Sequence, residues 1–169
     1  IDGEDMLLMN TYGPNIDDRD FYPHIQEIMT MVAEYRVIWS GDYNCVLDGE
    51  MDRSPLKHNN KLRMSRTLRE GLSNLGLCDI WRIRRPEQRE CTCYSATHNT
   101  YSRFDRIYVS EVIFNRVTKL LHLARYRSDH APVLLKVGWG ASTHNRPQWW
   151  LAPEVLLDNL GRETIDETL

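Results

Sequence analysis

Several features that mark special classes of protein are missing from this sequence of 169 residues. No run of about 18 apolar residues occurs, so no membrane-spanning helix is predicted. No basic and apolar leader with a small-residue cleavage site is visible, so no secretory signal is predicted. The formal net charge of −3 gives the chain no overall attraction to polyanions. We therefore expect a protein that is neither secreted nor embedded in a membrane.

Cysteine is scarce, and the spacing of the four cysteines excludes the common cysteine frameworks. They stand at Cys45, Cys78, Cys91 and Cys93. No Cys-x-x-Cys pair or matched histidine spacing indicates zinc. Cys91 and Cys93 are too close in sequence for an ordinary disulfide. We predict four reduced, partly buried thiols in an intracellular protein.

The composition that is present is typical of one globular domain. Hydrophobic residues make up 41% of the chain and charged residues 27%, which is ordinary for a domain with a core. Arginines gather in three groups, at 63–69, 82–85 and 103–106. Each group either binds phosphate or forms a solvated surface. Histidines without a partner at suggestive spacing, His122 among them, are expected on the surface.

Hydrophobic periodicity predicts strands and helices in a definite order. Strands are predicted over 6–12, 37–42, 91–95, 103–110, 117–124 and 132–139. Helices are predicted over 21–34, capped by Asp20, and over 61–75, ended by Gly76. Residues 96–101 are predicted to form a hairpin tip between the strands that flank them. Strands that alternate with helices early and form hairpins late indicate an α/β sandwich with a mixed sheet.

The stretch "YRVIWSGDYNCVLD", residues 35–48, changes from apolar to polar where its strand should end. The polar residues that follow the apolar run include Asp42 and Asn44. In an extended chain, residues two apart point to the same side. Asp42 and Asn44 are therefore predicted to share one face at the carboxyl end of this strand.

Two further polar sites stand beside predicted strands. Asp105 lies in "SRFDRIYV", and Asp129 and His130 lie in "SDHAPV". Taken singly, each site has an ordinary explanation: Asp105 next to Arg106 is typical of a surface ion pair, and a Ser-Asp-His turn before proline often forms only a local cap. The three sites in this order are a more specific signal than any one of them.

With their flanks, these segments resemble the consecutive motifs of the endonuclease/exonuclease/phosphatase superfamily. The similar stretches are "NTYGPN", "GDYNCVLD…DR", "CTCYS", "YSRFDRIYVS" and "SDHAPVLLKV". The subgroup that fits best is the apurinic-endonuclease-like nuclease domain of LINE-type (L1-like) retrotransposons. The resemblance implies that residues 1–139 are the C-terminal portion of a DNase I-like αββα sandwich of two sheets. It also implies a linker or tail toward a reverse transcriptase over 140–169.

The resemblance implies a role for each polar residue at a strand end. Asp42 resembles the carboxylate that orients or deprotonates the attacking water, and Asn44 the amide that holds the scissile phosphate and fixes Asp42. His130 resembles the imidazole that contacts a phosphoryl oxygen. Asp105 resembles the carboxylate that keeps this imidazole charged, which agrees with the effect of a carboxylate on a histidine pKa. Asp129 resembles a carboxylate near the metal that acts through water.

Other residues are implied to contact the phosphate or the DNA groove. Tyr12 resembles a phenol that hydrogen-bonds the phosphate, although a half-buried strand residue is an equal interpretation. Residues in the two strands and hairpin tip near the "CTCYS" motif resemble those that contact DNA: Thr92, Ser102, His98, Asn99 and Tyr101. The tip residues are expected to probe groove shape more than base identity. The alternative is a hairpin tip that makes no contacts.

The implied cofactor is a divalent cation, Mg²⁺ or Mn²⁺, because oxygen ligands favour these ions over zinc. Two opening motifs of the family do not occur in this chain: an Asn at the end of the first strand, and a metal-binding Glu in a Gln-Glu-Thr-like turn. We therefore expect that the first half of the domain is missing, on the order of a hundred residues. Weak metal affinity, impaired activity and an exposed apolar sheet face are the expected consequences.

Three functional hypotheses follow from the sequence. The first is a metal-dependent, DNA-nicking endonuclease of a LINE-like element, which acts in the nucleus and is otherwise cytoplasmic. The second is a phosphatase of inositol lipids or a similar phosphodiesterase of the same superfamily. The block "SRFDRI" argues against it, since those phosphatases usually carry a Trp-Cys-Asp-Arg-Ile-like block. The third is a catalytically dead remnant.

Overall fold

The computed structural model describes residues 5–31, 36–55 and 62–138, all within one compact unit of the chain, Ile1–Gly138. The predicted tail over 140–169 lies outside the described residues. Within the described residues, no helix is both long and apolar enough to cross a membrane.

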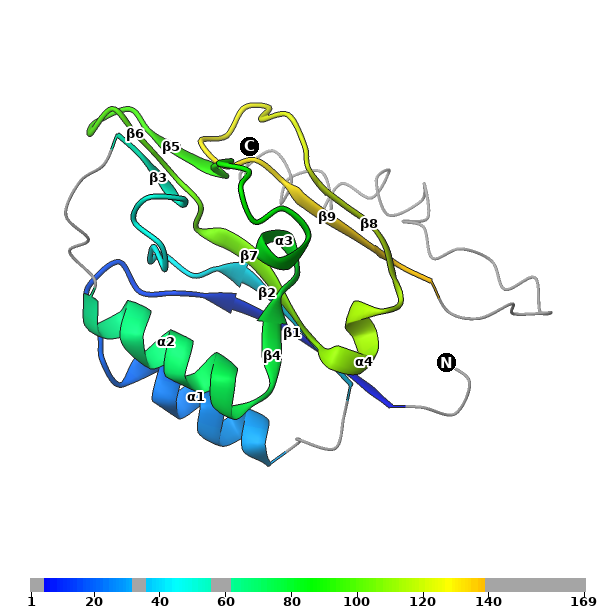
Figure 1. Cartoon of the computed structure of the whole chain (residues 1–169). Coiled ribbons are helices and arrows are strands. Elements are labelled where there is room, and N and C mark those ends of the chain that lie inside the picture. Colours follow the sequence, from blue (N-terminus) through cyan, green and yellow to red (C-terminus); the bar gives the residue numbers. More distant parts are fainter. Residues whose placement is uncertain (1–4, 32–35, 56–61, 139–169) are drawn as a thin grey trace, which may run out of the picture. The chain divides into compact units, whose positions relative to one another are not determined.

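A mixed four-stranded sheet is the largest element of the fold (Figure 1). Its strand order is β1 (Met6–Tyr12), β2 (Arg36–Asp42), β7 (Asp105–Ser110) and β4 (Leu77–Asp79). β1 and β2 run parallel, while β7 is antiparallel to both of its neighbours. The α/β class with a mixed sheet, predicted from sequence, is confirmed.

Two helices, α1 (Phe21–Thr30) and α2 (Leu62–Asn74), cover one side of this sheet (Figure 1). Leu68 and Leu72 of α2 are buried, as the helical stripe predicts, and Gly76 follows with a φ of +61°. Asp20 stands at the N-cap of α1 but its side chain makes no capping hydrogen bond, so that detail of the prediction is wrong. Residues 32–35 of the predicted helix lie outside the described residues.

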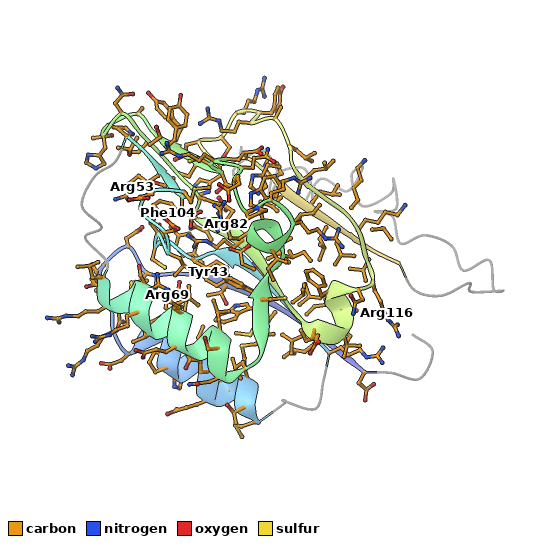
Figure 2. The ribbon with its side chains drawn as sticks, in the orientation of Figure 1. Tyr43, Arg53, Arg69, Arg82, Phe104 and Arg116 are labelled. Carbon is orange, nitrogen blue, oxygen red and sulfur yellow. The ribbon has the colours of Figure 1, made fainter. Side chains whose placement is uncertain are left out.

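Aromatic side chains form the core between the sheet and the helices. Tyr43 contacts the ring of Tyr108 at 4.9 Å and that of Trp39 at 5.2 Å, measured between centroids (Tyr43 is labelled in Figure 2). The indole of Trp39 donates to Thr11 Oγ1 at 2.7 Å, and the hydroxyl of Tyr22 donates to the carbonyl of Tyr43 at 2.6 Å. Burial of these rings, with the polar groups of Trp39, Tyr22 and Tyr43 hydrogen-bonded, fixes the carboxyl end of β2.

Two smaller sheets complete the described fold. One has the order β3 (Arg53–Ser54), β6 (Thr100–Ser102), β5 (Cys93–Ser95). The other is the hairpin of β8 (Val117–His122) and β9 (Val133–Val137), which lies on the side of the large sheet away from α1 and α2 (Figure 1). The short elements α3 (Ile80–Arg84) and α4 (Glu111–Phe114) were not predicted.

The predicted hairpin between 91–95 and 103–110 is wrong. β5 pairs with β6, and β7 enters the large sheet instead. The chain changes sheets at Arg103, whose backbone N–H donates to the carbonyl of Asp52 at 2.8 Å. The guanidinium of Arg103 is also buried beside Asp52. The chain therefore does not continue as one strand from β6 into β7.

A buried charge network underlies this change of sheet. Asp52 is 1% exposed and receives hydrogen bonds from Arg82 at 2.7 Å, Arg103 at 2.8 Å and Arg106 at 3.4 Å (Arg82 is labelled in Figure 2). Arg103 also donates to Asp79 at 2.6 Å. Despite the cost of burial, these cations hold the pKa of Asp52 far below its usual range. Two of the three arginine groups thus contribute to the interior, which the sequence did not indicate.

Candidate active site

Two carboxylates lie side by side on the sheet face opposite α1 and α2. Asp42 ends β2 and Asp105 begins β7, and the antiparallel register pairs them directly. Because side chains alternate along a strand, Trp39 points into the aromatic core while Asp42 points to the opposite face. The alternation along β2 therefore places a carboxylate where the apolar core ends.

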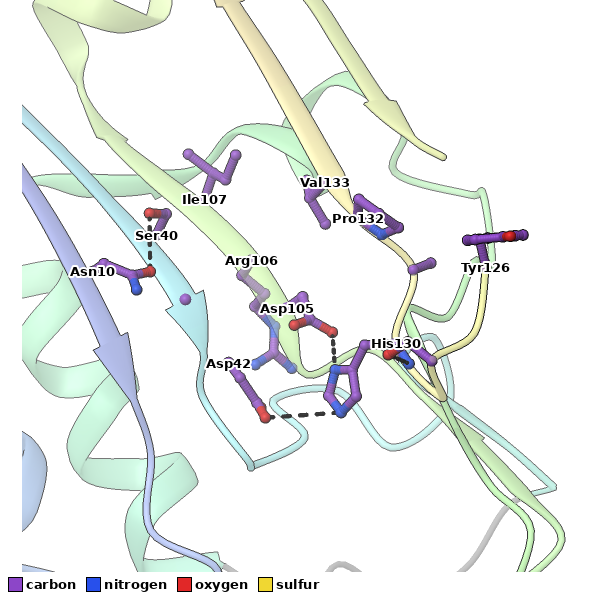
Figure 3. A pocket seen from close by; sticks show the side chains of 13 residues that line it. Asn10, Ser40, Asp42, Asp105, Arg106, Ile107, Tyr126, His130, Pro132 and Val133 are labelled. Atoms are coloured by element: carbon purple, nitrogen blue, oxygen red, sulfur yellow. Dashed lines mark hydrogen bonds and ion pairs between the residues drawn. The ribbon is translucent and has the colours of Figure 1, made fainter. Parts of the chain in front are cut away.

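His130 joins these two carboxylates from the segment that precedes β9. Its Nδ1 lies 2.8 Å from Asp105 Oδ2, and its Nε2 lies 3.9 Å from Asp42 Oδ2 (Figure 3). Backbone bonds hold this segment: the N–H of Ala131 donates to the carbonyl of Thr92 at 2.6 Å. Three residues from distant parts of the sequence thus converge on one place.

The surroundings of His130 favour its charged form. Burial by itself lowers the pKa of this imidazole, but the hydrogen bond to Asp105 and the negative charges of Asp105, Asp42 and Asp129 outweigh it, so the pKa is raised. An imidazolium donates from both ring nitrogens. His130 therefore directs a charged N–H toward Asp42 while Asp105 fixes the ring.

A pocket of about 590 Å³ opens in front of these three residues (Figure 3). Asp42, Asp105 and His130 all line it, together with Tyr126, which is 77% exposed. The predicted residues therefore open onto one surface, and their catalytic roles remain predictions. Tyr126 was not singled out from sequence, although its place four residues before the histidine of "SDHAPV" was a usable signal.

Asn44 does not share an extended face with Asp42, so that geometric prediction is wrong. Its φ of +48° turns the backbone into the left-handed region, which Asn tolerates better than most residues. Its backbone N–H donates to Asp42 Oδ1 at 2.8 Å, and its side-chain amide donates to the carbonyl of Gly13 at 2.8 Å. Asn44 is 8% exposed and is not among the lining residues of the pocket. It positions Asp42 and joins β2 to the loop after β1.

Tyr12 lies beside Asp42 in the register of β1 and β2 and is 68% exposed. It does not line the pocket. The proposed contact of its phenol with phosphate remains a prediction.

Thr92 and Ser102 are buried, at 0% and 4% exposed, which corrects their prediction as groove-contacting hydroxyls. Thr92 Oγ1 accepts from the backbone N–H groups of Phe104 and Asp105, at 3.1 and 3.0 Å. Ser102 Oγ accepts from Arg53 Nε at 3.3 Å. Thr92 therefore positions the start of β7, and with it Asp105, from inside the protein.

The hairpin tip carries the remaining predicted DNA contacts. His98 and Asn99 are exposed, Asn99 has a φ of +46°, and Tyr101 is 42% exposed. The ring of Tyr101 packs on Tyr94 with centroids 4.6 Å apart, and the guanidinium of Arg125 lies 5.4 Å and 5.5 Å from the two rings. Sequence reasoning missed Tyr94, which the pairing of β5 with β6 brings beside Tyr101, and Arg125, which reaches the two rings from the segment between β8 and β9.

Asp129, the predicted metal-site carboxylate, is exposed and lies next to His130 and the buried Cys93. One ligand atom of each of these three residues lies within 4.8 Å of the others. Burial, followed by the nearby carboxylates, raises the pKa of the Cys93 thiol to about 12. Sequence reasoning placed Asp129 here but treated Cys93 only as a partly buried thiol.

His122 is not a surface residue, contrary to expectation. Its side chain is 3% exposed and stacks on Trp81 with ring centroids 3.7 Å apart. Burial lowers the pKa of His122 to about 4. This histidine is therefore a neutral core residue, unlike His130.

Comparison with known proteins places this geometry in a structural context. No family model matches the chain. A curated relative from Xenopus laevis, the "Transposon TX1 uncharacterized 149 kDa protein", is 28% identical over 172 residues, which cover 98% of this chain and 13% of that protein. The chain thus spans about an eighth of the length of this relative.

Solved structures of nucleases share the fold. The 3′-5′ exonuclease NExo from Neisseria meningitidis is 22% identical with a TM-score of 0.66 over 79% of this chain and 62% of its own. The 3′ phosphatase NExo from Neisseria, as a variant bound to product DNA hairpin, is 20% identical with a TM-score of 0.63. This match covers 79% of this chain and 62% of the phosphatase chain. The AP endonuclease LMAP from Leishmania major is 20% identical with a TM-score of 0.59, over 68% of this chain and 42% of its own.

Proposed function

Because the chain has the fold of these exonuclease and AP-endonuclease structures, we propose that it hydrolyses phosphodiester bonds as the DNA-nicking endonuclease of a LINE-like retrotransposon. The observation that carries the proposal is the array of Asp105, His130 and Asp42 at one pocket. The likeness to the transposon TX1 protein supports the retrotransposon origin. A reverse transcriptase in the same longer protein and nuclear action on chromosomal DNA are parts of this proposal.

His130 is proposed to stabilise the negative charge that develops on the phosphoryl oxygens. An imidazolium N–H that is already oriented needs no reorganisation when this charge appears. Asp105 supplies the orientation through its 2.8 Å contact with Nδ1, so Nε2 faces the pocket and Asp42. Asp105 is a positioning residue in this account, and His130 is the residue that touches the phosphate.

Asp42 is proposed to accept the proton of the attacking water. Water at neutral pH is a weak nucleophile, so a carboxylate within hydrogen-bond reach of it accelerates the attack. The backbone N–H of Asn44 holds Asp42 Oδ1, and Asp42 Oδ2 is 3.9 Å from His130 Nε2. This distance is longer than a hydrogen bond, and a phosphate in the pocket would contact both groups.

A magnesium or manganese ion is proposed as the cofactor, with Asp129 as the carboxylate near it, acting through water. Mg²⁺ is usually bound by one or two carboxylates, with waters and substrate phosphate oxygens as the other ligands. Asp129 is exposed beside His130, so a hydrated ion has access to its carboxylate. When bound, the ion would supply positive charge next to the scissile phosphate.

DNA is proposed to lie across the pocket and the β5–β6 hairpin. One structure with this fold holds a DNA hairpin. In this chain, Tyr101 with Tyr94 and Arg125 presents two rings and a cation at the tip of that hairpin. Aromatic rings and arginine are suited to contacts with bases and phosphates respectively.

Nicking of supercoiled plasmid DNA in the presence of Mg²⁺ tests the proposal. The assay compares the wild-type chain, and a longer natural polypeptide that contains it, with Asp42→Asn. Glu27→Gln on α1, which is exposed and outside the pocket, is the matched carboxylate control. We expect nicking to be lost in Asp42→Asn and kept in Glu27→Gln.

Three outcomes would contradict the proposal. Nicking that persists in Asp42→Asn would remove Asp42 from the reaction. Release of phosphate from a phosphoinositide, without action on DNA, would favour the phosphatase alternative. Inactivity of every wild-type form toward both substrates would assign the chain a non-catalytic role.

A further inference from the structure

Cys93 is brought next to Asp129 and His130 by the pairing of two segments distant in sequence. Cys93 of β5 forms an isolated antiparallel bridge with His130. On either side of this bridge, the N–H of Tyr94 donates to the carbonyl of Asp129 at 2.9 Å, and that of Ala131 to the carbonyl of Thr92 at 2.6 Å. The backbone therefore fixes the approach of the three side chains.

These side chains form a cluster that differs from the oxygen-rich donor set expected for magnesium. A thiol, a carboxylate and an imidazole each offer a ligand atom, and these atoms lie within 4.8 Å of one another. In the described part of the chain, no other group of three or more Cys, His, Asp or Glu residues meets this distance. Thiolate and imidazole ligands select zinc-like ions, whereas Mg²⁺ prefers oxygen.

The geometry needs only a small closure to fit a tetrahedral ion. Zinc-to-ligand distances of about 2.0 to 2.3 Å place the ligands of a tetrahedral site about 3.3 to 3.8 Å apart. The observed separations, up to 4.8 Å, exceed this by about 1 Å. Cys93 and His130 are held by the backbone bridge, while Asp129 has an exposed side chain that can rotate. The carboxylate of Asp129 can therefore move toward an ion bound beside Cys93 and His130.

The surroundings of His130 also suit a metal ligand. A histidine that binds a metal usually donates its other ring N–H to a carboxylate, which orients the ring and increases its basicity. Asp105 lies 2.8 Å from Nδ1 and provides this contact, so Nε2 is the nitrogen available to a cation.

We propose that Cys93, Asp129 and His130 bind a thiophilic divalent cation such as Zn²⁺, and that this ion inhibits the reaction at the neighbouring pocket. Three protein ligands and a water complete a tetrahedral site. Binding forms the sulfur–metal bond and releases the thiol proton to solvent, together with any proton on His130 Nε2. The proposed metal binding depends only on the geometry of Cys93, Asp129 and His130. The inhibition rests on the proposed function, because the ion occupies the nitrogen that would contact phosphate.

Cobalt(II) spectroscopy on the whole chain tests the binding directly. Co²⁺ takes the place of Zn²⁺ and gives a thiolate-to-cobalt charge-transfer band in the near ultraviolet when sulfur is a ligand. We expect this band in the wild-type chain, and its loss in Cys93→Ser. Cys78→Ser removes a half-buried thiol of β4 outside the cluster and should keep the band.

Two further variants separate metal binding from misfolding. Asp129→Asn changes an exposed side chain, so it should leave the fold intact and weaken Co²⁺ binding. Asp105→Asn removes the carboxylate behind His130 and should weaken Co²⁺ binding by about 10- to 100-fold. A band that survives in Cys93→Ser, or its absence from the folded wild-type chain, would overturn the proposed site.

The inhibition is tested with Zn²⁺ added to the plasmid-nicking assay at saturating Mg²⁺. We expect Zn²⁺ to inhibit the wild-type protein, a zinc-selective chelator to restore its activity, and Cys93→Ser to resist inhibition. Equal inhibition of wild type and Cys93→Ser would overturn the inhibitory role. If the proposed nuclease function is wrong, no nicking is seen, while the cobalt band still reports on the site.

Discussion

Two Asp-Arg pairs, Asp52-Arg53 and Asp105-Arg106, look alike in sequence and differ completely in the folded chain. Asp52 is 1% exposed and its partners are Arg82, Arg103 and Arg106. The Asp105 side chain is 21% exposed and contacts His130 at the pocket. Neighbouring residues of an extended strand point to opposite sides, so Arg106 reaches into the interior while Asp105 faces the pocket.

The surroundings of each carboxylate determine whether it stabilises the fold or serves the pocket. Around Asp52, three cations compensate a buried charge, so its contribution is to the fold. Around Asp105, the partner is a single imidazole with a titratable proton and an open pocket in front of it. We therefore expect substitutions at the first site to change stability, and substitutions at the second to change chemistry.

The largest expected effect is on stability, in Asp52→Asn. Loss of this carboxylate leaves the buried Arg103 and Arg106 with reduced compensation, which should cost about 3 to 5 kcal/mol in the free energy of unfolding. Chemical denaturation followed by circular dichroism measures it, with Glu27→Gln as the exposed control. A loss within about 0.5 kcal/mol, the usual range for surface substitutions, would show that the network contributes little.

The second effect is on activity, in Asp105→Asn. Without the carboxylate, the pKa of His130 should fall, and less imidazolium is present at pH 7. We expect nicking to decrease by about 100-fold, comparable to the loss of one charge-stabilising donor, with partial recovery as the pH is lowered. Unfolding should change little, which distinguishes this variant from Asp52→Asn. A pH profile unchanged from wild type would rule out the proposed role of Asp105.

The fold could be predicted from sequence where the apolar runs are long. Strands 6–12 and 37–42 were found because each begins with a continuous apolar run, and Asp42, Asp105 and His130 were found because polar residues at strand ends are conspicuous. The register of β5 with β6 could not be found, since each strand has only three residues. The left-handed turn at Asn44 and the burial of Arg103 depend on contacts with Gly13 and Asp52, which no local pattern encodes.

The third effect concerns the pH dependence of stability, and comes from His122. Burial lowers the pKa of His122 from 6.5 to about 4, so the unfolded chain binds a proton that the folded chain excludes between these values. Stability should therefore fall as the pH decreases from about 6.5 to 4, by about 1 to 3 kcal/mol. His122→Phe keeps the stack on Trp81 and should remove this contribution in denaturation curves at pH 7 and pH 5.

His130 makes the opposite contribution and serves as the internal comparison. Its pKa is raised, so the stability it provides is present at low pH and is lost as the pH rises through the folded value. A pH dependence that is the same in wild type and His122→Phe would contradict the buried, neutral state of His122.

The smallest effect is on DNA affinity, in Tyr101→Ala. One ring of the pair with Tyr94 is removed, which should weaken binding to DNA by about 1 kcal/mol, the lower end for loss of one stacking contact. Fluorescence anisotropy with a labelled duplex measures it at fixed salt. Ile28→Ala is the control, because Ile28 is an exposed apolar residue of α1, the helix that covers the other side of the large sheet. Equal DNA affinities of Tyr101→Ala and Ile28→Ala would show that Tyr101 does not contribute to DNA binding.

The decisive experiment is a pH titration of His130, in which NMR monitors the ring protons of this histidine in the wild-type chain and in Asp105→Asn. The coupled array of Asp105, His130 and Asp42 predicts that His130 titrates above the ordinary histidine value of 6.5 in the wild type and at a lower pH in the variant. Titration of His130 at or below 6.5 in the wild type, with no change in Asp105→Asn, would contradict the array and the hydrolytic role built on it.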